Sequence, residues 1–340
     1  MHTILDVEKK SGVSHSTISR YLNGKKVTEE NRIKIEQAIA ELSYQRNPMA
    51  SGLKSKKTYT VGMVLPSISD PFFPKLVVGF QKYMREHGYQ TIFNSSDHDP
   101  ELEVQQVEIL ANKRVDGLVV ASVHKDGAHI QKCIRNGLPV ILLDRLIDGL
   151  KCDSVTVDNY NAVYDAISLC IRKGHKKIAF LGSKYYTDME RYRGFCVALE
   201  KAGLPLKEEY IARAQITQHN PARQFMRLLN LPEPPDLIFC SNIYHTLGAL
   251  ESVLEYKISI PKEVSILSFD ALETSPFYEF ARCIHPRFAS ICQPHEMISV
   301  ETAKLLLKRI KDGVSNYKPM RLELTTNFDI AESVADLSNL

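Results

Sequence analysis

Two kinds of hydrophobic spacing divide the chain close to residue 58. Over residues 1–57, apolar side chains recur every three or four positions, which is the spacing of short amphipathic helices. From Tyr59 onward, short apolar runs alternate with longer amphipathic stretches, which is the pattern of strands alternating with helices. We therefore expect an all-helical N-terminal head followed by a larger α/β body.

The head pattern predicts three short helices. Thr3 can cap the first helix, and Gly12 breaks it because glycine adopts the backbone angles of a tight turn. The second helix spans 14–23 and ends at Gly24, and Thr28 caps the third. A helix, a glycine turn, a second helix and a third in this order form a helix-turn-helix.

The second helix has an apolar and a polar side. Ile18 and Leu22 are four residues apart and face inward. The residues left facing outward are His15, Ser16, Ser19 and Arg20. Short polar groups and one long cation suit the base edges and phosphates of a DNA major groove. The alternative is a small helical bundle without a DNA role, which the outward polar row disfavours.

Charge is unevenly distributed between head and body. Residues 1–57 carry 11 Lys and Arg against 6 Asp and Glu, whereas the remainder carries 32 against 34. A basic head on a near-neutral body suggests that the head meets a polyanion. Charge alone leaves a solvated charged face equally open.

The body pattern predicts two similar lobes. Strand-like runs such as 61–65, 117–121 and 140–143 form a first series with intervening helices, and a second series begins after 155–157. Strands alternating with helices build parallel sheets covered by helices. A ligand of such sheets binds beyond the carboxyl ends of the strands, which places a small molecule in the cleft between two lobes.

The head also resembles a known family at fixed spacing. More than a dozen positions agree, in the segments Thr3-Ile4-x-Asp6-Val7, Ser11-Gly12-Val13-Ser14, Thr17-Ile18-Ser19-Arg20, Leu22-Asn23, Leu42-Ser43-Tyr44, Asn47-Pro48, Ala50 and Leu53. By this resemblance the chain is identified as a member of the lac repressor (LacI/GalR) family of transcription regulators. The resemblance implies a helix-turn-helix head, a two-lobed body like a periplasmic binding protein, and base contacts from His15 and Ser16.

Helix pattern and resemblance together give a set of expected DNA-binding residues: Thr3, Ser14, His15, Ser16, Thr17, Ser19, Arg20, Asn23, Asn47, Ala50, Leu53 and Lys54. The segment after Asn47-Pro48 is too short to be a stable helix alone. The resemblance implies that it is a hinge helix that forms on operator DNA, with Leu53 wedged between base pairs in the minor groove. Gly52 stands where a helix former is usual, so a plain flexible linker stays open as the alternative.

The resemblance also implies an effector site in the body. Phe72 and Phe73 follow the first strand, and we expect one of them to be core and the other to lie against a ligand ring. Arg191 falls on the family's effector-contact position and offers a planar fork of donors. Asp270, at a strand end, matches the family's acidic contact, although from its own sequence it could equally cap a helix.

Other candidate pocket residues depart from the family's pattern. Asn242 matches the family, but Ile243 replaces an Asp, which hints at a less hydrophilic ligand or one bound elsewhere. His219 falls near a stacking position, where a surface loop is the favoured alternative. We expect Asp144-Arg145 to be structural and Arg193 to be a surface cation.

These features give an expected organisation. A DNA-binding domain spans 1–46, a hinge or linker 47–58, and an effector-binding and dimerisation domain 59–340. Its first lobe covers about 59–158 and 291–322, and its second about 159–290 and 323–340. A head of this size reads half a site, so we expect a homodimer on a pseudo-palindromic operator. With 12 residues after Phe328, we expect no leucine-heptad tail of the kind that tetrameric relatives carry.

Several classes of protein are disfavoured. No run reaches the ~18 apolar residues of a membrane helix, and residues 1–6 lack a signal-peptide pattern. The seven cysteines are scattered singly, which argues against disulfides or a zinc site and fits the cytoplasm. The chain has no G-x-S-x-G, H-E-x-x-H or phosphate-binding glycine loop.

We therefore expect a non-enzymatic repressor without a metal or cofactor, controlled by a sugar or sugar derivative. The alternatives are a constitutive DNA-binding regulator with a vestigial pocket and a ligand-binding protein without DNA activity.

Overall fold

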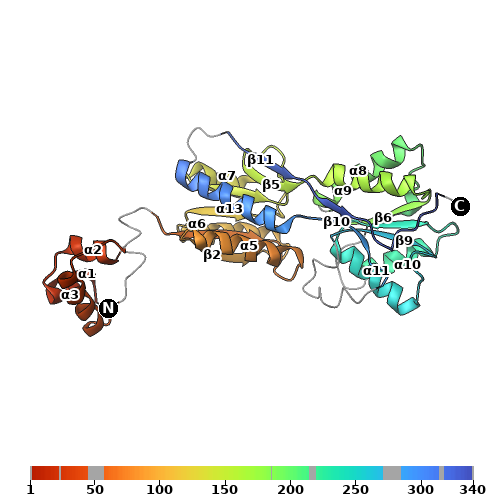
Figure 1. Cartoon of the computed structure of the whole chain (residues 1–340). Coiled ribbons are helices and arrows are strands. Elements are labelled where there is room, and N and C mark those ends of the chain that lie inside the picture. The colour runs from red at the N-terminus through yellow and green to blue at the C-terminus, as the bar shows by residue number, and fades with distance from the viewer. Residues whose placement is uncertain are drawn as a thin grey trace. The chain divides into compact units, whose positions relative to one another are not determined.

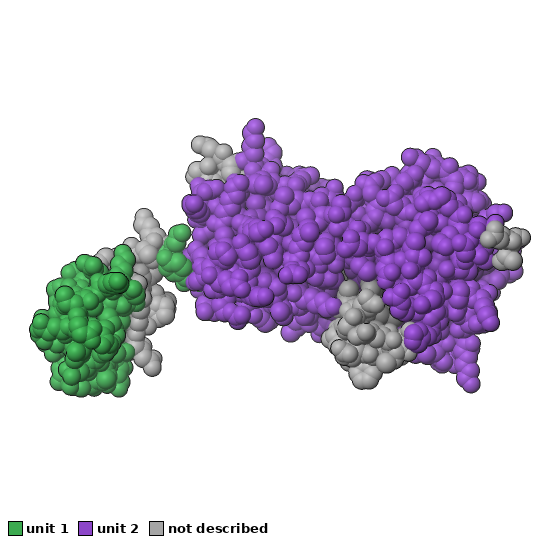
Figure 2. All heavy atoms as spheres, viewed as in Figure 1, with its two compact units in different colours: residues 1–59 green, residues 60–340 purple. Residues whose placement is uncertain are grey.

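A computed structural model of the chain describes residues 2–22, 24–44, 57–184, 186–213, 220–270, 285–313 and 318–338 (Figure 1). The chain divides into two compact units, Met1–Tyr59 and Thr60–Leu340 (Figure 2). The first is helical and the second is built on two parallel-stranded sheets.

The first unit contains α1 (Ile4–Ser11), α2 (His15–Leu22) and α3 (Glu29–Glu41). Asp6 Oδ2 accepts hydrogen bonds from the backbone N–H of Thr3 (2.7 Å) and from its hydroxyl (2.9 Å), which fixes the start of α1. Gly12 ends that helix in the left-handed region (φ 67°), where a side chain would be strained. The predicted helix, glycine turn and second helix are therefore confirmed.

The core of this unit is small. Its buried members come from all three helices and the turn: Val7, Val13, Ile18, Ile35 and Ala38. Ile33 is 44% exposed. It lies two residues from Ile35, which is more than half a helical turn away from the buried face. The core consequently fixes which side of α2 is outward, because Ile18 is buried at its centre.

The first sheet of the second unit has the strand order β11-β5-β4-β3-β1-β2, and every neighbouring pair is parallel. Its strands are β1 (Thr60–Leu65), β2 (Gln90–Ser95), β3 (Gly117–Val120), β4 (Val140–Leu143), β5 (Asp153–Val157) and β11 (Arg321–Leu324). Its helices are α5 (Phe72–Glu86), α6 (Pro100–Asn112), α7 (Ala128–Arg135) and α13 (His295–Asp312). Apolar residues of α5 and α13 share one core with the strands, and those of α6 and α7 share another. The helices therefore cover both faces.

The second sheet has the order β12-β10-β9-β8-β6-β7, in which only the β10–β12 pair is antiparallel among the described strands. Its strands are β6 (Ile178–Gly182), β7 (Ile211–Arg213), β8 (Leu237–Cys240), β9 (Ser265–Phe269), β10 (Ala289–Cys292) and β12 (Asn327–Asp329). The accompanying helices are α8 (Asn159–Arg172), α9 (Tyr186–Lys201), α10 (Asn220–Leu229) and α11 (Ile243–Tyr256), with a short 3₁₀ helix at Glu208–Tyr210. The predicted two-lobed α/β fold is confirmed.

The chain passes between the two sheets three times. It leaves the first sheet after β5, returns from β10 to α13 through Gln293 and Pro294, and crosses again between β11 and β12. The first lobe therefore includes β11, and the second includes β10 and β12. Three crossings between two lobes are the places where a hinge would lie, and they connect strand ends of both sheets.

Asp153 and Arg309 form a buried ion pair that joins three parts of the first lobe. Arg309 Nε lies 2.5 Å from Asp153 Oδ2, and Arg309 Nη2 lies 3.0 Å from Asp153 Oδ1. The same carboxylate accepts from the backbone N–H of Met320, and Arg309 donates to the carbonyl of Lys318. The pair thus ties β5 and α13 to the chain that leads into β11.

We predict that Asp153→Ala lowers the free energy of unfolding by about 3–5 kcal/mol, because it leaves a buried guanidinium without its counter-ion. Urea denaturation followed by circular dichroism measures the change. The matched control is Glu108→Gln, which breaks the exposed Lys132–Glu108 pair. That control should change the same free energy by less than about 1 kcal/mol. Equal effects of the two substitutions would contradict a structural role for the buried pair.

Candidate functional site

The outward side of α2 presents the polar groups that the sequence predicted there. Ser16 and Arg20 are exposed, and His15, Thr17 and Ser19 are partly exposed. Ser16 and Arg20 are four residues apart and therefore lie on one side of the helix. This side carries hydroxyl, imidazole and guanidinium groups, which can donate to and accept from nucleotide edges.

Contacts within the first unit hold α2 in place. The backbone N–H of His15 donates to Glu8 Oε1 (2.9 Å), so α1 caps the first residue of α2. The Ser14 hydroxyl lies 3.1 Å from the hydroxyls of both Ser16 and Thr17. Thr3 is exposed at the start of α1. The remaining expected DNA-binding residues lie outside the described residues: Asn23, Asn47, Ala50, Leu53 and Lys54.

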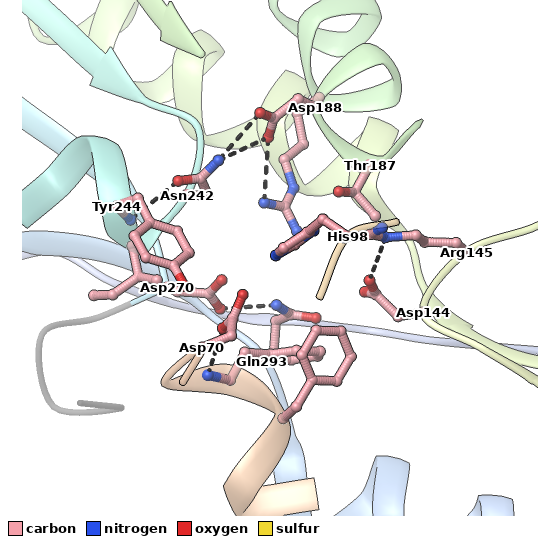
Figure 3. A pocket seen from close by; sticks show the side chains of 14 residues that line it. Asp70, His98, Asp144, Arg145, Thr187, Asp188, Asn242, Tyr244, Asp270 and Gln293 are labelled. Atoms are coloured by element: carbon pink, nitrogen blue, oxygen red, sulfur yellow. Dashed lines mark hydrogen bonds and ion pairs between the residues drawn. The ribbon is translucent and has the colours of Figure 1, made fainter. Parts of the chain in front are cut away.

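The second unit contains a polar pocket with about 500 Å³ of empty space, which includes its open mouth (Figure 3). Five of its 14 lining residues follow the ends of strands, with Asp144 and Arg145 after β4, Asn242 after β8, Asp270 after β9 and Gln293 after β10. The rest comes from the segment between β1 and α5, from α9, and from His98, Ile243 and Tyr244. The pocket therefore lies at the carboxyl ends of strands of both lobes, where α/β sheets bind their ligands.

Arg191 is the most constrained polar side chain of the pocket. Its Nε donates to Asn159 Oδ1 (2.8 Å) and its Nη1 to the carbonyl of Ser241 (2.6 Å). The guanidinium carbon lies 3.4 Å from the ring centroid of Phe269, and Nη1 is 3.8 Å from Asp188 Oδ1. A guanidinium held on several sides presents its remaining donors in a fixed direction.

Asp188 and Asn242 continue this network on the second lobe. Asp188 Oδ2 accepts from the backbone N–H of Ser183 (2.9 Å), from the Ser183 hydroxyl, and from Asn242 Nδ2 (3.1 Å). Asn242 Oδ1 accepts from the N–H groups of Tyr244 and His245 and so caps α11. Asn242 is thus both a helix cap and part of the pocket wall.

Three further carboxylates lie in the pocket, and neighbouring groups compensate their negative charges only in part. Burial raises the pKa of Asp70 to about 6, helped by repulsion from Asp270 and Asp144. Burial likewise raises the pKa of Asp270 and of Asp144. Asp144 Oδ2 lies 3.5 Å from Arg145 Nε, and Asp270 Oδ1 accepts from Gln293 Nε2 (2.8 Å). Raised carboxyl pKa values mean that the negative form is under-stabilised here.

The two adjacent phenylalanines both line the pocket and both pack in the core. Their ring centroids are 5.1 Å apart in an edge-to-face arrangement. Phe73 is 1% exposed and Phe72 is 8% exposed, so Phe72 is the one nearer the open space. Phe72 also lies 5.3 Å from the ring of His295. The division of roles between the two rings stays a prediction.

The structure brings together five of the six effector residues expected from the sequence: Phe72, Phe73, Arg191, Asn242 and Asp270. His219 lies outside the described residues. Sequence reasoning missed Asp70, His98, Thr187, Asp188, Tyr244 and Gln293. It also favoured a structural role for Asp144 and Arg145, whereas the structure places both in the pocket lining. Their position directly after a buried strand was the available signal.

Across the described ranges, no group of three or more His, Cys, Asp or Glu side chains is arranged to hold a metal ion. Nor, within the same ranges, is any helix both long and apolar enough to cross a membrane.

Two family models match the chain. Residues 3–47 match the model described as bacterial regulatory proteins, lacI family. Residues 58–326 match the model of periplasmic binding proteins and the sugar binding domain of the LacI family. Together they cover the head and most of the body, and the second alone covers more than half of the chain.

Curated relatives and solved structures agree with these models. The HTH-type transcriptional repressor CytR of Escherichia coli (strain K12) is 30% identical over 91% of this chain and 90% of its own length. Catabolite control protein A of Priestia megaterium is 30% identical over 90% of this chain and 92% of its own length.

Among solved structures, a complex of the transcriptional regulator CelR with cellobiose is 26% identical, with a TM-score of 0.70 over 98% of this chain and 100% of that chain. The structure of the lac repressor dimer bound to operator and the anti-inducer ONPF is 20% identical in sequence. It has a TM-score of 0.83 over 98% of this chain and 99% of that chain, and therefore shares the fold. The resemblance drawn from the head motif is thereby confirmed, and the chain belongs to the LacI family of bacterial regulatory proteins.

Proposed function

We propose that this chain is a transcriptional repressor that binds a pseudo-palindromic DNA operator as a homodimer and is controlled by a small molecule bound between its lobes. The observation that carries the proposal is the combination of an outward polar side on α2 with a polar pocket at the strand ends of two lobes. The repressor CytR, which is similar over nine-tenths of the chain, supports it. The action is non-enzymatic and takes place in the cytoplasm.

DNA recognition follows from the chemistry of α2. His15 and Ser16, at the start of the helix, contact base edges, and the guanidinium of Arg20 reaches a phosphate or a guanine. A single head of this size covers half of a site, so two copies of the chain are needed for a full operator. The solved lac repressor dimer on its operator supports the same arrangement.

Effector control follows from the position of the pocket. A ligand that contacts Arg191 on one lobe and Asp144 on the other binds one relative position of the lobes better than another, and this difference shifts their equilibrium. Hydroxyl groups suit the carboxylate and guanidinium groups present, and the CelR–cellobiose complex supports a sugar or sugar derivative.

The proposed organisation is a DNA-binding domain at 1–46, a linker at 47–58 and an effector and dimerisation domain at 59–340. In this proposal the linker passes the lobe movement to the head, and Leu53 inserts into the minor groove.

Selection of bound sequences from random duplex DNA tests the DNA-binding part. The purified protein should enrich a pseudo-palindrome at low salt and physiological salt alike. Failure to enrich any sequence, with and without a sugar panel, would exclude a sequence-specific repressor. Subsequent release of the enriched operator by members of the panel tests effector control. A protein that enriches an operator but is released from it by no small molecule would be a constitutive regulator.

We predict that His15→Ala and Ser16→Ala each weaken binding to the enriched operator by about 5- to 150-fold, the equivalent of a lost base contact of ~1–3 kcal/mol. Binding to random DNA should change much less, because phosphate contacts remain. Fluorescence anisotropy with labelled duplexes measures both. Gln37→Ala, an exposed neutral substitution on α3, is the control and should leave both affinities unchanged. Equal losses on operator and random DNA would remove these two residues from base recognition.

We predict that Arg191→Lys leaves operator affinity within about threefold but raises the effector concentration for half-release at least about tenfold. Lysine keeps the charge beside Asp188 but lacks the planar fork, so it loses charged hydrogen bonds worth ~1.5–3 kcal/mol to the ligand. The measurement is operator release by the sugar that releases the wild type. Arg193→Lys on the same helix is the control, because Arg193 is exposed. An unchanged effector response of Arg191→Lys would remove this side chain from the site.

A further inference from the structure

Two carboxylates, Asp70 and Asp270, meet in one part of the pocket (Figure 3), and each receives few hydrogen bonds from the described residues. Asp270 Oδ1 receives a hydrogen bond from Gln293 Nε2 (2.8 Å). Gln293 Oε1 is buried and has no hydrogen-bond partner among the described residues, and the whole residue is 6% exposed. Asp70 Oδ1 receives only the backbone N–H of Phe72 (2.8 Å) within the same ranges. Figure 3 shows Asp70, Asp270 and Gln293 gathered on one side of the pocket.

The charges of the pocket are also unbalanced. Its described lining contains four aspartates, at 70, 144, 188 and 270, but two arginines, at 145 and 191. Each arginine lies beside one aspartate, Arg145 near Asp144 (3.5 Å) and Arg191 near Asp188 (3.8 Å). Neither Asp70 nor Asp270 forms an ion pair with a described residue. Within the described lining, the excess of negative charge therefore falls on Asp70 and Asp270, which receive one hydrogen bond each, while Lys75 outside the lining partly offsets the charge of Asp270.

The protonation behaviour of this pair agrees with the geometry. Asp270 and Asp144 repel the charge of Asp70, and burial raises the pKa of Asp70 further, to about 6. Arg191 and Lys75 act in the opposite direction on Asp270, yet burial still raises the pKa of that carboxyl. For both carboxyls, burial therefore outweighs the positive charge that the described residues place nearby.

A protonated primary amine matches what is missing. An ammonium group carries one positive charge and three N–H donors, whereas a sugar hydroxyl carries no charge and a single donor. One ammonium between the two carboxylates (Figure 3) can donate to an oxygen of Asp70 and to one of Asp270 at the same time. A neutral polyol would leave two buried negative charges uncompensated, which is unfavourable at low local dielectric.

We propose that the ligand of this pocket is an amino sugar, whose ammonium group binds Asp70 and Asp270 together. Its ring hydroxyls then face Arg191 and Asn242, which hold donors and acceptors on the opposite wall. This inference rests on the proposed function, because it names the class of effector for the same pocket. It assigns a charge preference to Asp70.

Isothermal titration calorimetry with matched sugars tests the proposal without DNA. The probes are D-glucosamine, D-galactosamine and D-mannosamine, each compared with its parent hexose and its N-acetyl derivative. At about pH 7, at least one amine should bind about tenfold or more tightly than both of its neutral partners, as expected for a charged hydrogen-bonded contact. An amine and its neutral partners binding equally would overturn the proposal, and so would the absence of binding by all three amines.

The matched variants are Asp70→Asn and Asp165→Asn. Asparagine at 70 keeps an oxygen for the Phe72 N–H but removes the negative charge, so the preference for the amine should fall to about threefold or less. Asp165 is exposed on α8, and its variant should keep the full preference. Thermal denaturation of both variants checks that they fold. A folded Asp70→Asn protein that keeps the full preference would overturn the role of Asp70.

The pH dependence gives an independent readout. Asp70, whose neighbours are Asp270, Asp144 and Arg145, gains a proton as the pH falls through about 6. The amine sugar stays protonated at lower pH, so its affinity should drop several-fold between about pH 7 and pH 5 because the carboxylate is lost. Asp70→Asn should reduce this drop. A wild-type affinity for the amine that is constant or rises over this range would contradict the proposal.

The operator experiment separates this inference from the proposed function. Release of the enriched operator by a neutral sugar alone would leave an effector-controlled repressor in place and would overturn only the amine preference. Failure to enrich an operator would remove the repressor function, while calorimetry would still show whether the pocket selects an ammonium group.

Discussion

The pocket depends on one buried guanidinium. Arg191 is 3% exposed, and a charge that far from water is tolerated only when it is paired and hydrogen-bonded. Its partners come from four places: Asn159 at the start of α8, Ser241 after β8, Phe269 at the end of β9, and Asp188 on α9 itself. Because these segments are separated in sequence by up to 110 residues, satisfying one side chain fixes the relative positions of the strand ends that form the pocket wall.

The carboxylates on the other side of the pocket behave in the opposite way. Asp188 is saturated by Ser183 and Asn242 and is part of the rigid wall. Asp70 and Asp270 have few donors, and burial raises the pKa of both. A binding site needs this asymmetry, since groups that are already satisfied position the ligand, whereas groups left unsatisfied gain most when it arrives. The pocket therefore combines side chains that are held by several hydrogen bonds with carboxylates whose negative charge is incompletely compensated.

Local sequence features predicted the parts of the structure that local forces determine. The cap at Thr3, the turn at Gly12 and the buried Ile18 follow from positions a few residues apart, and all are found in the first unit. The resemblance located Arg191 and Asp270. It did not locate Gln293 or Asp144, because their roles arise where separate strands end at one gap. Gln293 contacts Asp270 only because β10 lies beside β9 in the sheet. The short strands β7, β11 and β12 were also not evident in the sequence, because their hydrophobic runs are only three or four residues long.

The separation of the two units limits how a ligand can act on DNA binding. Val7, Val13 and Ile18 orient the outward side of α2 from within the first unit, so the shape of the reading surface does not depend on the state of the pocket. Ligand binding can change only what the pocket touches, which is the relative position of the two lobes at the three crossings. In the proposed dimeric repressor, the effect on operator affinity would therefore pass through the spacing of the two heads rather than through the chemistry of either head. Its size cannot exceed the difference in ligand affinity between the two arrangements of the lobes.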